Sequence, residues 1–262
     1  TIVVAGHGAE AVSKAAKAFD PDVQIVLQAE QRGTGHAVQQ AAPLLTGETG
    51  DAIVLYGDTP FLRTETLDRM MQARARHSVV FLGFPAQDPA RYGRMVTDSE
   101  ELLRIVEFKD ATPEERSLTL CNSGVVCADT ALLLDLVAQL DSTNAAGELY
   151  LTDIVALARM RGLSAGVVIG DEAETLGIDT RAQLARAETL FQTAMRTEAL
   201  ENGVTLTAPD TVFFALDTHI GRDAIIAPNV VFGPGVTVES GAVIHAFCHC
   251  LLYTSPSPRD RG

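Results

Sequence analysis

The sequence is poor in positive charge. It carries 20 Lys and Arg residues against 34 Asp and Glu residues, which gives a formal net charge of −14. A surplus of negative charge repels phosphate backbones and anionic lipid headgroups, so it argues against nucleic-acid and membrane-surface partners. A site for an anionic ligand must therefore supply its own local cations or a metal ion.

Long apolar runs and a targeting leader are also missing. No run reaches the roughly 20 apolar residues of a membrane span, and no charged-then-apolar segment opens the chain. We therefore expect a cytoplasmic protein without a membrane partner. The chain starts at Thr1 inside an apolar run, "TIVVAGHG", so we expect the natural N-terminus to lie upstream.

Paired cysteine motifs are absent as well. The four cysteines do not form the repeated C-x-x-C pairs of a structural zinc site. The segment "HAFCHC", residues 245–250, contains possible metal ligands, but ordinary reduced thiols are the favoured interpretation.

What is present is a regular alternation over residues 1–180. Short β-branched runs at residues 1–4, 23–27, 51–58 and 78–84 alternate with helical patterns at residues 9–19, 35–45 and 64–77. This rhythm predicts a Rossmann-like α/β domain with a mostly parallel sheet covered by helices. Such sheets bind ligands beyond the carboxyl ends of their strands.

A different pattern follows residue 180. Residues 181–203 predict one connecting helix that stops at Asn202 and Gly203. Over residues 204–250 a large apolar residue recurs at every sixth position: Phe214, Ile220, Ile226, Phe232, Val238 and Ile244. A hexapeptide period predicts a parallel β-helix. The period fails in residues 251–262, "LLYTSPSPRDRG", which we interpret as a non-native tail.

Several loops carry candidate functional residues. Asp58 ends a buried run in "LYGDTP", where a carboxylate can hold Mg²⁺ beside phosphates, although a turn or helix cap is the commoner role of such an Asp. The "GTG" at residues 33–35 can serve as a phosphate cradle, a base clamp or a tight turn. Asp179 and Thr180 can simply cap the connecting helix.

Taken in order, the motifs carry a resemblance. "QAEQRGTGHA", "LYGDTP", "RYGR", "IVEFKDAT", "NSGV", "GELYLTDI" and "GIDTRAQL", followed by hexapeptide coils, closely resemble the bacterial bifunctional N-acetylglucosamine-1-phosphate uridylyltransferase / glucosamine-1-phosphate N-acetyltransferase family. The resemblance covers residues 1–249. It implies that the β-helix is left-handed and that the domains are a nucleotidyltransferase domain (1–180), a connecting helix (181–203) and the first coils of an acetyltransferase domain (204–250).

The resemblance also implies roles for individual residues. The "GTG" loop becomes a uracil clamp, and the nucleotide contacts are Gln28, Gly33, Thr34, Tyr56, Gly57 and Asp58. The implied sugar contacts are Gly93, Glu107, Asn122, Thr152 and Asp179. Asp58 and Asp179 are the implied catalytic residues, acting as ligands of Mg²⁺. Asp179 stands where the family usually has Asn, which keeps an oxygen ligand and adds a negative charge.

The implied reaction joins UTP and N-acetylglucosamine 1-phosphate into UDP-N-acetylglucosamine and pyrophosphate, a step toward cell-wall precursors. The parent protein would also acetylate glucosamine 1-phosphate with acetyl-CoA and form a homotrimer through its β-helix. The family's glycine-rich triphosphate loop, with its Arg and Lys, is not found in this sequence, and most of the β-helix is missing. We therefore expect the 262-residue chain to have little or no uridylyltransferase activity.

Two alternatives stay open. A single-function sugar-1-phosphate nucleotidylyltransferase would share the sheet and Asp58, but it need not share "NSGV", "GELYLTDI" or the hexapeptide coils. A non-catalytic β-helix assembly fragment would not need Asp58, Glu107 and Asn122 together.

Overall fold

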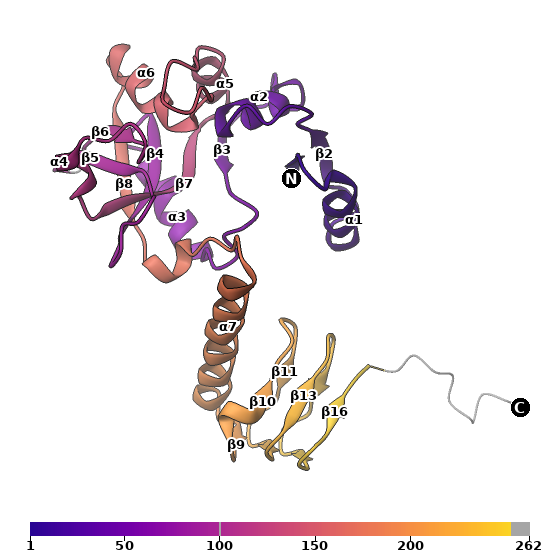
Figure 1. The fold of residues 1–262 in the computed structure, drawn as a ribbon. Coiled ribbons are helices and arrows are strands. Elements are labelled where there is room, and N and C mark those ends of the chain that lie inside the picture. The colour runs from indigo at the N-terminus through magenta and orange to yellow at the C-terminus, as the bar shows by residue number, and fades with distance from the viewer. Residues whose placement is uncertain (100, 253–262) are drawn as a thin grey trace, which may run out of the picture. The chain divides into compact units, whose positions relative to one another are not determined.

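The computed structural model describes residues 1–99 and 101–252. Its residue contacts divide the chain into two units, Thr1–Gly177 and Ile178–Gly262, which are described separately (Figure 1). The predicted tail at residues 251–262 lies outside the described residues from position 253 onward. Within the described part of the chain, no helix is both long enough and apolar enough to cross a bilayer.

The first unit alternates strands and helices. In chain order they are β1 (Ile2–Ala5), α1 (Ala9–Phe19), β2 (Gln24–Leu27), α2 (Thr34–Leu45), β3 (Asp51–Val54), α3 (Thr64–Ala73), β4 (Val79–Pro85), β5 (Arg94–Asp98), β6 (Glu101–Val106), α4 (Pro113–Arg116), β7 (Leu120–Asp129), α5 (Thr130–Val137), η1 (Leu151–Asp153), α6 (Ile154–Met160), β8 (Ala165–Ile169) and η2 (Glu172–Thr175). The strand and helix types predicted from the first 84 residues are confirmed, and the α/β class with them.

The sheet, however, is mixed. Its strand order is β3-β7-β4-β8-β6-β5, and among the described strands of this sheet only β4 and β8 pair in parallel. β7 runs antiparallel to both β3 and β4, and β5 and β6 form an antiparallel hairpin. The expectation of a mostly parallel sheet is therefore wrong for these six strands, although β1 and β2 form a separate parallel pair. An apolar run shows that a strand is buried but not which way its neighbour runs.

The core of the first unit lies on both faces of this sheet. Val79 and Phe81 of β4 join one apolar cluster, which is shared with α5 and α6. Val80 and Leu82 point the other way and pack with Met70 of α3. Because side chains alternate along a strand, helices on both faces bury nearly the whole of β4, which explains its unbroken apolar sequence.

The second unit begins with the predicted connecting helix, α7 (Arg181–Glu201). The Thr180 hydroxyl accepts from the Gln183 N–H, and the Gln183 side chain accepts from the Thr180 N–H, so the two residues form a capping box. The helix ends where predicted, because Asn202 is its C-cap and Gly203 has a φ of +87°.

After α7 the chain forms short parallel strands. They are β9 (Thr205–Leu206), β10 (Val212–Phe213), β11 (His219–Ile220), β12 (Ile225–Ile226), β13 (Val230–Phe232), β14 (Thr237–Val238), β15 (Val243–Ile244) and β16 (His249–Cys250), with η3 at Pro209–Thr211. From β10 onward, paired residues lie 18 positions apart, as Val212 and Val230 do. Three hexapeptides therefore make one coil, and the predicted hexapeptide β-helix is confirmed.

The sixth-position residues form the core of these coils. Phe214, Ile226, Phe232 and Val238 are buried, and Ile220 and Ile244 are partly buried against them. The rings of Phe214 and Phe232, one coil apart, lie 5.7 Å from centroid to centroid. Cys248 and Cys250 also pack against this cluster and are free thiols.

Ile225 and Ile226 provide a matched test of this packing. Ile226 is 0% exposed, whereas its neighbour Ile225 is 42% exposed. We expect Ile226→Ala to lower the free energy of unfolding by about 2–5 kcal/mol, through lost burial and a residual cavity. Ile225→Ala is expected to change it by about 0.5 kcal/mol. Urea denaturation followed by circular dichroism measures both, and equal losses would contradict the assigned core.

Candidate functional site

The loop from Gln28 to Thr34 is held by internal contacts. The Gln28 side chain is buried, and its Nε2 donates to the carbonyl of Gly33 at 3.2 Å and lies 3.1 Å from His36 Nδ1. Gly33 has a φ of +108°, and a Cβ there would meet the Leu149 carbonyl oxygen at 2.6 Å. Glycine is therefore required at this turn, whatever ligand the loop holds.

This loop is joined to a distant segment by backbone hydrogen bonds. The Leu149 N–H donates to the Arg32 carbonyl and the Gly35 N–H to the Leu149 carbonyl, both at 2.8 Å. The Leu151 N–H donates to Thr34 Oγ1 at 3.1 Å, across 117 positions of sequence. The "GTG" and "GELYLTDI" motifs thus form one structural element.

Tyr56 connects this element to the sheet. Its phenol forms a side-chain hydrogen bond with Thr34, and burial, the largest cause, raises the pKa of Tyr56 to about 12. Its ring lies so close to Gly124 of β7 that a Cβ there would be 1.7 Å from Tyr56 Cε2. Tyr56 therefore spans the space between the "GTG" loop and β7.

Four predicted sugar contacts lie together beside this element. Glu107 Oε1 accepts from the Thr152 hydroxyl at 3.0 Å, and a Cβ on Gly93 would lie 3.3 Å from Glu107 Oε2. The Asn122 N–H donates to the Gly93 carbonyl at 2.9 Å, and Asn122 Oδ1 accepts from the Gly124 N–H at 3.0 Å. Burial is the main cause that raises the pKa of Glu107, while the Thr152 hydrogen bond opposes it.

Asp58 follows β3 and presents a carboxylate without competing partners. It is exposed, as is Gly57, and no described residue forms a hydrogen bond or ion pair with its side chain. A Cβ on Gly177 would lie 4.0 Å from Asp58 Oδ2, so the space beside the carboxylate is open. Free carboxylate oxygens suit Mg²⁺, which usually keeps waters and substrate phosphates as its other ligands. The Asp58 carboxylate is therefore suited to serve as a ligand of Mg²⁺.

Asp179 belongs to the second unit. It lies just before α7, and its N–H donates to Gln183 Oε1 at 2.8 Å, so its backbone takes part in the helix cap. No group of three or more His, Cys, Asp or Glu side chains suited to a metal occurs in the described residues. The pairing of Asp58 with Asp179 on one ion stays a prediction.

Two residues near the site are not among the predicted site residues. Arg94 is 2% exposed and donates to the carbonyls of Pro89 and Ala90 at 3.2 Å and Arg116 at 3.3 Å. It thereby fixes the segment that leads to Gly93. The other is Asp153, whose pKa is raised to about 6, first by burial and then by nearby carboxylates. The Arg beside Gly in "RYGR" was the available signal for Arg94, and the Asp that follows Thr152 in "GELYLTDI" was the available signal for Asp153.

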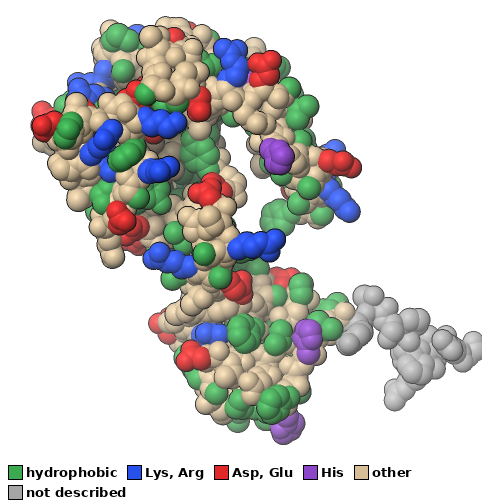
Figure 2. All heavy atoms as spheres, viewed as in Figure 1, with side chains coloured by type: hydrophobic (Ala, Val, Ile, Leu, Met, Phe, Trp, Pro, Cys, Tyr) green, Lys and Arg blue, Asp and Glu red, His purple; other side chains and the backbone are tan. Residues whose placement is uncertain are grey.

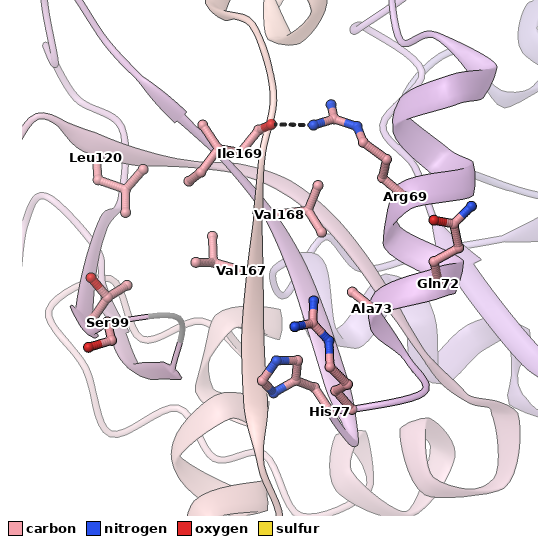
Figure 3. Close-up of a pocket in the computed structure, with 11 residues that line it drawn as sticks. Arg69, Gln72, Ala73, His77, Ser99, Leu120, Val167, Val168 and Ile169 are labelled. Atoms are coloured by element: carbon pink, nitrogen blue, oxygen red, sulfur yellow. Dashed lines mark hydrogen bonds between the residues drawn. The ribbon is translucent and has the colours of Figure 1, made fainter.

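A separate pocket lies between α3 and β8 (Figure 3). Arg69 reaches across it to donate to the Ile169 carbonyl at 3.0 Å, and the lining includes His77, Leu120 and Val167. None of the predicted site residues lines this pocket. It is therefore distinct from the site around Tyr56 and Glu107.

Comparison with known proteins places this arrangement in a family. Residues 5–173 match the family described as Nucleotidyl transferase. The chain belongs to this family. Residues 217–251 match the family described as Bacterial transferase hexapeptide (six repeats), which agrees with the coils found after α7.

Individual relatives agree with the nucleotidyl transferase assignment. The chain is 71% identical over 248 residues to a protein named "Bifunctional protein GlmU" from Cereibacter sphaeroides. Proteins of the same name from Paracoccus denitrificans and Jannaschia sp. are 60% and 58% identical over 248 residues. Each match covers 95% of this chain and 55% of the relative, so the chain spans about half the length of these curated relatives. The resemblance drawn from the motifs is confirmed.

Gly124 offers a test of the Tyr56 position. Gly124 and Gly47 have φ values of +88° and +89°, but only Gly124 has a side chain within 4 Å of a built Cβ. Both Gly→Ala variants carry the left-handed strain of about 1–2 kcal/mol. We expect Gly124→Ala to lose about 1–3 kcal/mol more than Gly47→Ala, because Tyr56 must move. Urea unfolding compares them, and equal losses would contradict the contact.

Asp153 makes stability depend on pH. Its pKa is about 6 in the folded chain, against an ordinary value of 3.8, so its protonated form is favoured by folding. This contribution is fully present below pH 3.8 and is lost as the pH rises through 6. We therefore expect Asp153→Asn to stabilise the chain more at pH 7 than at pH 4. Unfolding free energies at both pH values test this, and a pH-independent difference would refute it.

Proposed function

We propose that this chain binds UTP and N-acetylglucosamine 1-phosphate and belongs to an enzyme that joins them into UDP-N-acetylglucosamine and pyrophosphate. The observation that carries the proposal is the continuous set of contacts that joins Thr34, Tyr56, Gly124, Asn122, Gly93, Glu107 and Thr152, which come from separate segments. The nucleotidyl transferase family and the name shared by the relatives support the same reaction.

The nucleotide would bind at the Thr34 end of this chain of contacts, at the start of α2. A uracil is flat and carries donors and acceptors on its edge, so a backbone turn without side chains can read it closely. Gln28 holds that turn through its hydrogen bond to Gly33, and Thr34 ties it to Tyr56. Of the three initial interpretations of "GTG", we therefore favour the base clamp, built on a turn that needs glycine in any case.

The sugar would bind between Glu107, Asn122 and Thr152. A carboxylate accepts hydrogen bonds from sugar hydroxyls, and an amide side chain can both donate and accept. Gly93 beside Glu107 leaves room for a ring to approach, since a Cβ there would already contact the carboxylate. Contacts with the sugar would then hold its 1-phosphate in position to attack the nucleotide.

The attacking group needs little activation. A sugar phosphate is largely ionised at pH 7, so its oxygen can attack the α-phosphorus of UTP without a general base, and pyrophosphate leaves. Asp58, together with Asp179, would hold Mg²⁺, which neutralises phosphate charge when bound. Alignment and charge neutralisation therefore carry the proposed catalysis. The expected weak activity of this 262-residue chain stays a prediction.

The coils favour a second proposal for the whole protein. The residues on the outer surface of the strands include Phe213, Ile225, Val231 and Val243, all of which are exposed. Apolar rows on parallel coils suit association between copies. We propose that the whole protein forms a homotrimer through them and acetylates glucosamine 1-phosphate with acetyl-CoA.

On the face of the molecule in Figure 2, acidic and basic side chains are interspersed over the first unit, as on a solvated surface.

Thr152 allows the proposed site to be tested by binding. We expect saturable binding of UDP-N-acetylglucosamine with Mg²⁺ in titration calorimetry. Thr152→Val keeps the shape but removes the hydroxyl that donates to Glu107, so we expect about five- to tenfold weaker binding. The matched control is Thr46→Val, whose exposed hydroxyl donates to the Ala42 carbonyl; it should bind like the unchanged chain.

Two results would count against the proposal. Equal affinity for UDP-glucose, which lacks the acetamido group, would favour the single-function alternative that acts on another sugar. Absence of binding by a chain shown to be folded would favour the non-catalytic assembly fragment.

A further inference from the structure

Glu174 is a buried carboxylate outside the proposed ligand contacts. It lies in η2, is 3% exposed, and accepts from the Thr66 hydroxyl at 2.7 Å. The same oxygen accepts from the Arg63 N–H at 3.4 Å, and the Arg63 guanidinium lies 3.9 Å from the other oxygen. A buried carboxylate is rarely retained unless it is paired, and Glu174 meets three donors.

These contacts make Glu174 the cap of α3. Arg63 is the N-cap residue of this helix, and its own side chain accepts no hydrogen bond from the first turn. An arginine has no acceptor to offer, so the helix start depends on another group. Glu174, 111 positions away, supplies a negative charge at the positive end of the helix.

The Thr66 hydroxyl extends this cap into a directed network. It donates to Glu174 and accepts from Arg69 Nη2 at 3.1 Å. Arg69 in turn donates to the carbonyl of Ile169 at the end of β8, as Figure 3 shows. The first two turns of α3 are therefore tied at two places to the segment that runs from β8 to η2.

Both tied segments flank Asp58. The loop that carries Asp58 runs directly into Arg63 and α3, so the cap fixes its downstream end. Gly177 follows Glu174 by three residues, and its built Cβ lies 4.0 Å from Asp58 Oδ2. Glu174 is thus joined by short stretches of chain to the loop that presents the carboxylate and to the residue facing it.

We propose that Glu174 is a positioning residue for the metal-binding carboxylate of Asp58. It touches neither substrate nor metal; it holds the Asp58 loop against the segment that contains Gly177. The inference rests on the proposed function, because it takes Asp58 as a ligand of Mg²⁺. Loss of Glu174 should therefore weaken the metal-dependent part of ligand binding and leave the metal-independent part unchanged.

The test measures UDP-N-acetylglucosamine binding by calorimetry over a series of Mg²⁺ concentrations. We expect Glu174→Ala to raise the Mg²⁺ concentration for half-maximal effect about tenfold, which corresponds to ~1.4 kcal/mol. Affinity without metal should stay within about twofold, a range that corresponds to ~0.4 kcal/mol. Glu174→Gln keeps an acceptor for Thr66 and should fall between. The matched control is Glu172→Gln in the same η2, whose carboxylate accepts from the Gln87 N–H at 3.3 Å rather than from Thr66 or Arg63.

A second variant keeps the test decisive if Glu174→Ala does not fold. Thr66→Val removes the hydroxyl that donates to Glu174 and accepts from Arg69, with little change of shape. We expect the Mg²⁺ concentration for half-maximal effect to rise about threefold, less than in Glu174→Ala, because the Arg63 contacts of Glu174 remain. Unchanged Mg²⁺ dependence in folded variants would overturn the inference, as would equal weakening with and without metal. Absence of Mg²⁺-dependent binding by the unchanged chain would instead overturn the proposed function.

Discussion

The antiparallel pairing of β7 is the constraint on which the first unit depends. β7 forms ladders with β3 and β4 and contacts β5 through the pair Arg94 and Cys121. The ladder with β4 shifts register between Phe81 and Gly83. At that irregularity the Ser123 hydroxyl donates to the Leu82 carbonyl and accepts from the Val125 N–H, so the interrupted ladder stays satisfied. The same irregularity places Gly124 where Tyr56 can pack on it, and core pairing and site geometry therefore have one cause.

The site is built at the expense of local stability. Burial disfavours the charged form of Glu107 and of Asp153, and the two carboxylates also repel each other. A fold selected only for stability would replace them with neutral side chains. Two carboxylates that repel each other, one of them near the Tyr56 phenol, give a site whose energy is lowered when hydrogen-bond donors or cations bind to it. Sugar hydroxyls and a metal ion are ligands of that kind.

Several features of the fold could be predicted from local sequence patterns. The hexapeptide period predicted the β-helix. The Thr180 cap and the stop at Asn202 and Gly203 predicted both ends of α7, because each signal depends on residues a few positions apart. The direction of β7, the contact of Tyr56 with Gly124 and the capping of α3 by Glu174 were not readable. The Ser123 contact with Leu82 spans 41 positions and the Glu174 contact with Arg63 spans 111, and neither partner carries a local mark of the other. The family resemblance supplied the site residues that periodicity alone left open.

The two units consequently form their contacts in different ways. From β10 onward each coil pairs with the chain 18 residues away, so its packing repeats a nearly local rule. The site of the first unit instead requires Thr34 to meet Leu151 across 117 positions and Arg63 to meet Glu174 across 111. Contacts of such long range gain nothing until the intervening chain is ordered. The candidate site is therefore a property of the completely folded first unit, so a change in β7 or η2 can alter the positions of Tyr56 and Asp58 in the loop after β3.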